Sequence, residues 1–183
     1  MNKKTVLAAL AACLVAGAAP KLKADDIHGY MIPEYYFNLS SADGSSVDGQ
    51  HGLWIRRIYL GYNTKISDRF SARVRLEMNS TAFGENTLTP YVKNAHLAYS
   101  LGGGAEVLAG IIEPPSFDRI EKFWGLRFIE KTPADFFKLA SSRDTGVALN
   151  GKTKGGLVYT VMYGNYSSNK GEDNKGKAVY GRL

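Results

Sequence analysis

The sequence predicts an all-β protein, an antiparallel up-and-down β-barrel of the kind that crosses a membrane with its strands. Three observations predict it. Eight segments alternate between apolar and polar residues, the connections between them are alternately long and short, and aromatic residues gather near the segment ends. Strands of about ten residues suit a tilted crossing, and tight turns on one side with longer loops on the other are typical of such barrels.

The chain begins with a segment typical of an export signal. Lys3 and Lys4 precede an uncharged run rich in Ala, Leu and Val at residues 5–19, and small residues offer cleavage after Ala18 or Ala24. This layout predicts a signal peptide at residues 1–24 and an exported protein. Two alternatives stay open, namely a buried N-terminal helix and a lipoprotein cleavage box that ends at Cys13.

The net charge of +6 comes mostly from this segment. It holds four of the 23 basic residues and none of the 17 acidic ones, so residues 25–183 carry a charge of about +2. So small a charge gives no reason to expect a nucleic-acid partner. The single Cys excludes an intramolecular disulfide framework, and three scattered His make a His-based metal site unexpected. We therefore expect no cofactor, no metal and no catalytic residues, hence not an enzyme.

The expected strands cover most of residues 27–183. They span residues 27–40, 53–66, 69–80, 91–101, 106–113, 143–151, 157–168 and 177–183. The third is the clearest, because apolar residues from Phe70 to Met78 occupy one face and polar residues from Arg69 to Asn79 the other.

The first two strands are expected to alternate in the same way. In the first strand one face carries Ile27, Met31, Tyr35, Phe37 and Leu39. In the second, Trp54 is expected on the same face as Ile58, opposite Arg57.

The connections and the polar faces together favour a water-filled interior. Long connections are expected at residues 41–52, 81–89, 114–142 and 169–176, and short ones at 67–68, 102–104 and 152–156. A polar row such as Arg73, Arg75 and Glu77 cannot face lipid, where a central Arg or Lys costs about 2–4 kcal/mol. The alternatives are an open sheet that faces solvent and, for the aromatic residues, ordinary packing in a soluble barrel.

Several segments resemble one family of outer-membrane proteins. Residues 54–62 (WIRRIYLGY), 66–74 (ISDRFSARV), 108–117 (LAGIIEPPSF), 128–131 (FIEK) and 142–151 (SRDTGVALNG) resemble the phosphate-selective porin O and P family in order and spacing. The resemblance implies a bacterial outer-membrane channel in contact with lipid, a homotrimer of barrels with ~16 strands each, and passive diffusion of small hydrophilic solutes, anionic or neutral.

The end of the chain departs from that pattern. About eight strands are expected where the family has roughly twice that number, and residues 181–183 fall within a strand that ends on Leu183 rather than on an aromatic residue. We therefore expect residues 25–183 to be the N-terminal part of a porin domain. Two alternatives are a complete small barrel, and a non-channel outer-membrane barrel that serves as an adhesion or structural protein.

The long connection at residues 114–142 is the expected functional element. Apolar residues recur at helical spacing from Phe117 to Trp124, and the run from Thr132 to Asp135 reads as a helix N-cap. In the resembling family the corresponding loop folds into the barrel and narrows it. We therefore expect Phe117, Ile120, Phe123, Trp124 and Phe128 to pack against the lumen wall.

Charged residues of this loop and of the third strand are the candidate pore lining. They are Arg73, Arg75, Glu77, Asp118, Arg119, Glu121, Lys122, Arg127 and Lys131. Residues 113–144 hold six basic and six acidic residues, so the loop is neutral. Because Arg73 and Arg75 add positive charge on the strand, the expected ion preference is weak and towards anions.

Overall fold

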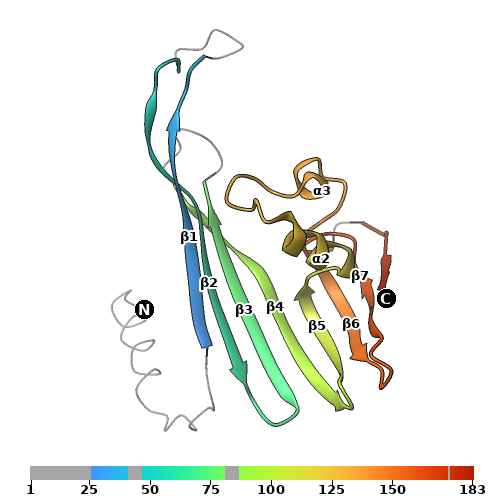
Figure 1. Cartoon of the computed structure of the whole chain (residues 1–183). Coiled ribbons are helices and arrows are strands. Elements are labelled where there is room, and N and C mark those ends of the chain that lie inside the picture. Colours follow the sequence, from blue (N-terminus) through green and yellow to red (C-terminus); the bar gives the residue numbers. More distant parts are fainter. Residues whose placement is uncertain (1–25, 41–46, 81–86, 173) are drawn as a thin grey trace, which may run out of the picture.

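The computed structural model describes residues 26–40, 47–80, 87–172 and 174–183. It is all-β apart from two short helices (Figure 1). The elements in chain order are β1 (Asp26–Phe37), β2 (His51–Lys65), β3 (Phe70–Asn79), β4 (Thr89–Gly102), β5 (Ala105–Ile112), α2 (Pro115–Trp124), α3 (Pro133–Phe136), β6 (Asp144–Lys152), β7 (Val158–Gly164) and β8 (Ala178–Arg182). The proposed export segment, residues 1–24, lies outside the described residues.

The eight strands form one antiparallel sheet in chain order, from β1 to β8. Each strand pairs with the next along the chain, so the topology is up-and-down, as the sequence predicts. The alternation of long and short connections is also confirmed. Among the described residues β1 and β8 pair on one side only, so the sheet is open rather than closed into a barrel.

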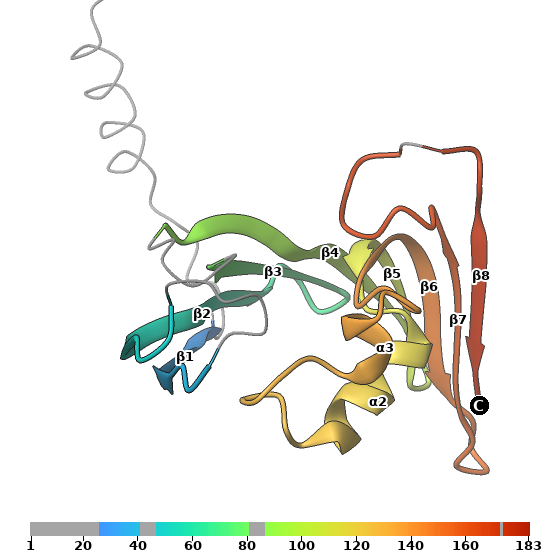
Figure 2. The same ribbon diagram turned by 90° about the horizontal axis from the view of Figure 1, so that it is seen from above.

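The sheet curves into a trough whose concave side holds α2 and α3. Figure 2 shows β1–β4 running into β5–β8 at a steep angle, with both helices inside the corner. The helices therefore cover the concave face of the sheet, and α2 packs against β7 and β8.

The polarity of the two faces is the reverse of that in a soluble sheet. Register places Leu97, Val147 and Val179 in one row on the convex face, where they are 50–75% exposed. On the concave face Arg57, Glu77 and Asn94 are 1–5% exposed, beside a small apolar core of Ile112, Ala148 and Met162. Soluble proteins bury apolar residues and expose charged ones, so this sheet has its polar side inside.

Two β-bulges change which residues face the concave side. Ile32 pairs with Arg57 and Pro33 with Ile55, so Arg56 is an extra residue on β2. Arg75 likewise pairs with Asn94 and Leu76 with Val92, which leaves Lys93 as an extra residue on β4. A bulge sets two residues against one and re-aims side chains locally.

Because of the first bulge, the expected face of Trp54 on β2 is wrong, whereas the expected faces of β1 and β3 are confirmed. On β2 the outward positions are Leu53 and Ile55 before the bulge and Leu60 after it, so Trp54 does not share a face with Ile58 as expected. The expected faces of β1 are confirmed, because Ile27, Met31, Tyr35, Phe37 and Leu39 are all exposed. The third segment is the expected strand, with Phe70 and Val74 outward and Glu77 buried.

The segment between β5 and β6 has the predicted helical signals. Pro115 opens α2 and Gly125 ends it in the left-handed conformation with φ of 62°. The Thr132 side chain accepts a hydrogen bond of 3.3 Å from Asp135 N and caps α3, with Pro133 in its first turn. The residues that the sequence indicates as a cap therefore form one.

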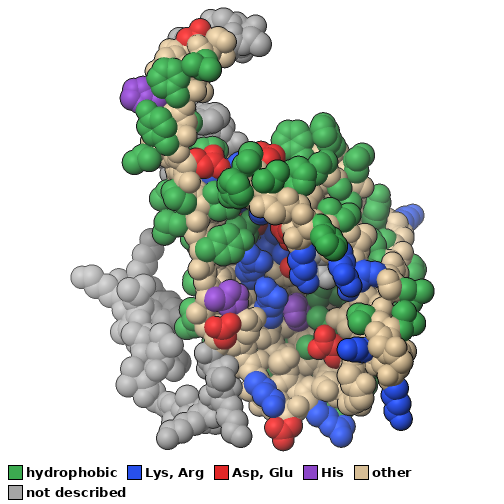
Figure 3. All heavy atoms as spheres, in the orientation of Figure 1, with side chains coloured by type: hydrophobic (Ala, Val, Ile, Leu, Met, Phe, Trp, Pro, Cys, Tyr) green, Lys and Arg blue, Asp and Glu red, His purple; other side chains and the backbone are tan. Residues whose placement is uncertain are grey.

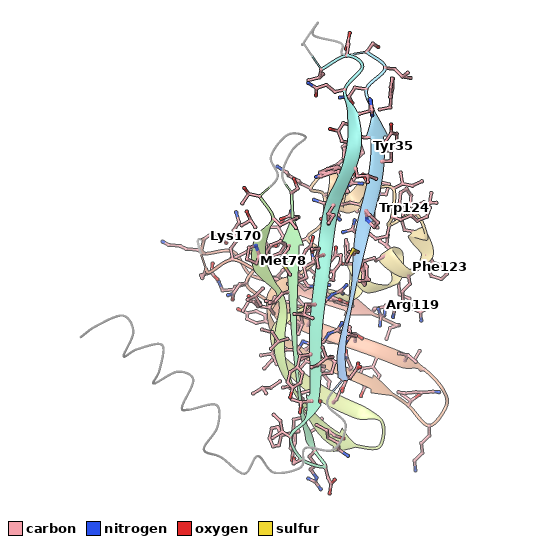
Figure 4. All side chains as sticks on the ribbon, turned by 90° about the vertical axis from the view of Figure 1, so that its left-hand side faces the viewer. Tyr35, Met78, Arg119, Phe123, Trp124 and Lys170 are labelled. Atoms are coloured by element: carbon pink, nitrogen blue, oxygen red, sulfur yellow. The ribbon has the colours of Figure 1, made fainter. Side chains whose placement is uncertain are left out.

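The apolar residues of this segment divide between two directions. Phe117 is 2% exposed, and Trp124 is partly buried. The expectation that Ile120, Phe123 and Phe128 pack on the wall is wrong for this structure, because they are 47–82% exposed. With about 3.6 residues per turn, Phe117 and Trp124 share one side of α2, whereas Phe123 lies roughly 120° away. Figure 4 shows Phe123 on the side of α2 remote from the sheet.

Candidate functional site

A cluster of charged side chains lies on the concave face, where α2 and α3 approach the wall. Figure 3 shows Lys and Arg side chains gathered in a hollow between the β1–β3 wall and the helical segment. At its centre Glu77 of β3 lies 3.6 Å from Arg57 Nε and 3.0 Å from Lys93 Nζ. Two cations share one buried carboxylate, so this group carries a net positive charge.

Aromatic rings hold a further cation beside this group. The Arg75 guanidinium lies 4.4 Å from the centroid of the Tyr59 ring and donates a hydrogen bond of 3.0 Å to the Tyr30 hydroxyl. The two tyrosine rings are 4.7 Å apart. A guanidinium over an aromatic face is attracted by the ring quadrupole. These contacts therefore hold the Arg75 guanidinium in one position.

Side chains of β2, β4 and β8 tie the helical segment to the sheet, and on β8 Arg182 donates to the Pro115 carbonyl at 3.1 Å. Arg56 of β2 lies 3.0 Å from Glu34 of β1 and pairs with Glu130 of the segment, and its guanidinium also donates to the Ile129 carbonyl. Arg127 donates to the Tyr59 hydroxyl at 3.2 Å. The remaining tie runs from Lys93 to the Ser142 hydroxyl, also at 3.2 Å.

Charge pairing stabilises the segment internally as well. Arg143 Nη2 lies 2.7 Å from Glu113 Oε1, which joins the two ends of the segment, and Arg127 pairs with Glu121 at 3.2 Å. Burial works against the charged form of Arg127, but the Tyr59 hydroxyl and Glu121 outweigh it and raise its pKa above the ordinary value. The Arg127 guanidinium is therefore charged at neutral pH.

Glu130 is held in its ionised form. Burial alone would raise the pKa of this carboxyl, but a hydrogen bond of 2.7 Å from Lys131 N and the Arg56 guanidinium hold the pKa below its ordinary value. The Trp124 indole N–H also donates to the Glu130 backbone carbonyl at 3.0 Å. Glu130 is thus in contact with both Arg56 of β2 and Trp124 of α2.

Asp144 fixes the connection between β7 and β8. Its carboxylate is fully buried and accepts hydrogen bonds from Tyr166 N at 2.9 Å, Ser167 N at 3.3 Å and the Tyr180 hydroxyl at 3.0 Å. Gly164 lies against this carboxylate, since a Cβ at Gly164 would lie 2.2 Å from Asp144 Oδ2. The absence of a side chain there makes room for the carboxylate.

The concave side is hollowed on both sides of the segment. Towards the short turns lies a chamber of about 1160 Å³, whose lining includes Arg73, Asn94, His96 and Lys122. Towards the long connections lies a hollow of about 450 Å³, whose lining includes Lys93, Lys131 and Lys170. Residues of the segment line both hollows, and Glu77 and Lys93 line the smaller one.

The structure brings together some of the sequence-predicted site residues and separates others. Arg73, Arg75 and Glu77 lie on the concave face, Lys122 lines the larger hollow and Lys131 the smaller one, and Glu121 pairs with Arg127. Arg119 is exposed on α2 and contributes to neither hollow (Figure 4). The side chain of Asp118 lies outside the part that the structure describes.

The sequence-predicted pore lining leaves out several members of the site. They include Arg56, Arg57, Lys93 and Arg143, which are partners in the ion pairs described above. Two of them are the extra residues of the bulges, which a strict period of two cannot place. One signal was available, because Pro33 lacks the N–H that a regular ladder needs and prolines inside strands mark edges or bulges.

The described residues offer little for other chemistry. Within them no group of three or more His, Cys, Asp or Glu side chains suits a metal ion. Among the same residues, no helix has the length and apolar character needed to cross a membrane. Comparison of the chain with protein-family models, with curated proteins and with solved structures gave no match.

Proposed function

We propose that this chain is part of an outer-membrane porin, a channel for passive diffusion of small hydrophilic solutes. In this proposal the strands form part of the channel wall, and the segment between β5 and β6 forms the constriction. The observation that carries the proposal is the reversed polarity of the sheet. An exposed apolar convex face suits lipid, and a charged concave face suits a water-filled lumen. In this proposal the strands are one part of a closed barrel of roughly 16 strands that assembles as a trimer, as the resemblance to the phosphate-selective porin O and P family implies.

The placement of aromatic residues supports a membrane setting. Phe70 and Tyr99 pack together with ring centroids 4.7 Å apart at the short-turn end of β3 and β4. Tyr35 and Phe37 are exposed near the opposite end of β1. Aromatic residues at both lipid interfaces are typical of outer-membrane barrels.

The charge cluster supports a weak preference for anions. Arg57 and Lys93 together exceed the single charge of Glu77, and Arg75 adds a further cation beside them. Fixed charges in a narrow passage act on ions within about one Debye length, ~8 Å at physiological ionic strength. The numerous acidic partners in the segment keep the expected preference small.

Planar-bilayer recording of the full-length protein tests the proposal. We expect discrete conductance steps and a reversal potential in a KCl gradient that indicates modest anion preference. Deleting residues 116–141 should enlarge the conductance step, because the segment occupies the concave side. An unchanged step would show that the segment does not narrow the passage, and cation preference would show that the charge assignment is wrong.

A second candidate function is adhesion by a barrel that does not conduct. It is favoured by the β1–β2 hairpin, which extends well beyond the other strands (Figure 1) and exposes Phe37, Leu39 and Leu53 near its tip. Absence of any conductance in a protein that inserts into bilayers, together with binding that Leu53→Ser weakens, would support this candidate instead.

A further inference from the structure

We propose that Arg56 is a positioning residue, which holds the segment between β5 and β6 across the concave face through Glu130. The inference deepens the proposed function, and it rests on that function only in its conductance measurement. It starts from the bulge opposite Pro33, where Arg56 is the residue without a partner on β1. Arg57 follows directly and is buried against Glu77, so the side chains of two consecutive arginines both lie on the concave side.

The contacts of Arg56 join three parts of the chain. Its guanidinium lies 3.0 Å from Glu34 on β1 and pairs with Glu130, 74 residues further along the chain. Its side chain is 16% exposed, and those of Glu34 and Glu130 are 26% and 34% exposed, so the pairs are partly shielded from water. Charge-assisted hydrogen bonds of a guanidinium to carboxylates are the stronger kind, and shielding strengthens them.

Glu130 is the matching anchor on the segment. Its side chain pairs with Arg56 and accepts from Lys131 N, while its backbone carbonyl accepts from the Trp124 indole. The end of α2 and the turn that follows it are therefore fixed to the same arginine. Loss of this anchor would free the part of the segment that follows α2.

The second bulge repeats the arrangement. Lys93 is the extra residue of β4, and it contacts the segment through Ser142 at 3.2 Å. Both cations that the bulges add to the concave face thus reach the segment, one at Glu130 and the other at Ser142. A regular sheet with a period of two would present neither cation there.

Limited proteolysis tests the anchor without any reference to conduction. Trypsin sites at Arg127, Lys131 and Lys138 lie in the segment, and the turn at Lys65 provides an internal standard. In the full-length protein in detergent we expect Arg56→Gln and Glu130→Gln each to speed cleavage in the segment roughly tenfold, the effect of losing about 1.4 kcal/mol. Cleavage at Lys65 should not change.

The double variant and a matched control sharpen the result. Because both changes break the Arg56–Glu130 pair, Arg56→Gln with Glu130→Gln should be cleaved about as fast as Arg56→Gln alone, which also loses the contact to the Ile129 carbonyl, and not a hundredfold faster. Arg69→Gln removes the same charge from an exposed position that contacts Tyr99 rather than the segment; it also removes a trypsin site in the β2–β3 turn, but the segment should be cleaved as fast as in wild type. Arg56→Lys keeps the charge and should fall between wild type and Arg56→Gln.

The outcomes separate the anchor from the proposed channel. Unchanged cleavage of the segment in Glu130→Gln, which leaves the wall intact, overturns the anchor, as does a multiplicative effect in the double variant. In bilayers we expect Arg56→Gln to raise open-channel current noise and Arg69→Gln not to raise it. If the proteolysis pattern holds but wild-type protein gives no conductance, the anchor stands and the porin function is wrong.

Discussion

Arg56 lies opposite Pro33 in a β-bulge, where Pro33 pairs with Ile55 and leaves Arg56 without a partner on the neighbouring strand. Proline cannot donate to the ladder, so the local loss of regular pairing has little cost there. The consequence is chemical, because an arginine that strict alternation would send outwards instead contacts Glu34 and Glu130. Backbone irregularity and charge placement on the concave face are thus linked.

Removal of the Glu77 carboxylate should strongly destabilise the sheet. In Glu77→Gln the side chains of Arg57 and Lys93, 6% and 12% exposed, lose their common counter-charge. An uncompensated buried charge costs about 3–5 kcal/mol. Urea unfolding followed by tryptophan fluorescence should show the loss, and Glu77→Gln with Lys93→Met should recover part of it. Glu172→Gln breaks the exposed pair with Lys177 and should leave the midpoint unchanged.

A side chain at Gly164 should displace the Asp144 carboxylate. In Gly164→Ala the new Cβ would lie 2.2 Å from Asp144 Oδ2, closer than real contacts allow. We expect a loss of about 1–3 kcal/mol, the usual range for overpacking. Gly181→Ala is the matched control, because no atom lies within 4 Å of a Cβ there. Equal stability of the two variants in urea unfolding would contradict the tight fit.

A charged side chain on the convex face should destabilise the protein only when that face is in contact with lipid. Val74→Lys places an ammonium on the outward face of β3, whereas Ser71→Lys places it on the inward face. In a bilayer the outward charge costs about 2–4 kcal/mol near the midplane. Folding into phosphatidylcholine vesicles, followed by urea titration, should separate the two variants. Equal behaviour would mean that this face does not meet hydrocarbon.

Acid should release the segment through Glu130. Its pKa is below the ordinary value of 4.5, so ionised Glu130 contributes stability above pH 4.5 that is lost as pH falls through the lowered pKa. Trp124 reports the change, because its indole N–H donates to Glu130 O. In a Trp54→Phe background, emission should shift below pH 4.5, and Glu130→Gln should show the released signal already at pH 7. A pH profile that Glu130→Gln leaves intact would assign the transition to other acids.

The strand faces and the turn pattern could be predicted from sequence because they depend on local geometry. Side chains alternate along any strand, so the polar and apolar residues of β3 define its two faces without knowledge of its neighbours. The cap of α3 is equally local, since Thr132 and Asp135 are three residues apart. Up-and-down topology followed from connections of alternating length.

Only the tertiary structure decided where the alternation of inward and outward side chains along a strand is interrupted. A bulge is a property of two paired strands, so the extra positions of Arg56 and Lys93 depend on register with β1 and β3. The partners of these residues lie far along the chain, and Glu130 is 74 residues from Arg56. Likewise the direction of Phe123 away from the sheet depends on how α2 docks, which helical spacing does not fix. Local periodicity therefore determined the faces, and long-range register determined which charges meet on them.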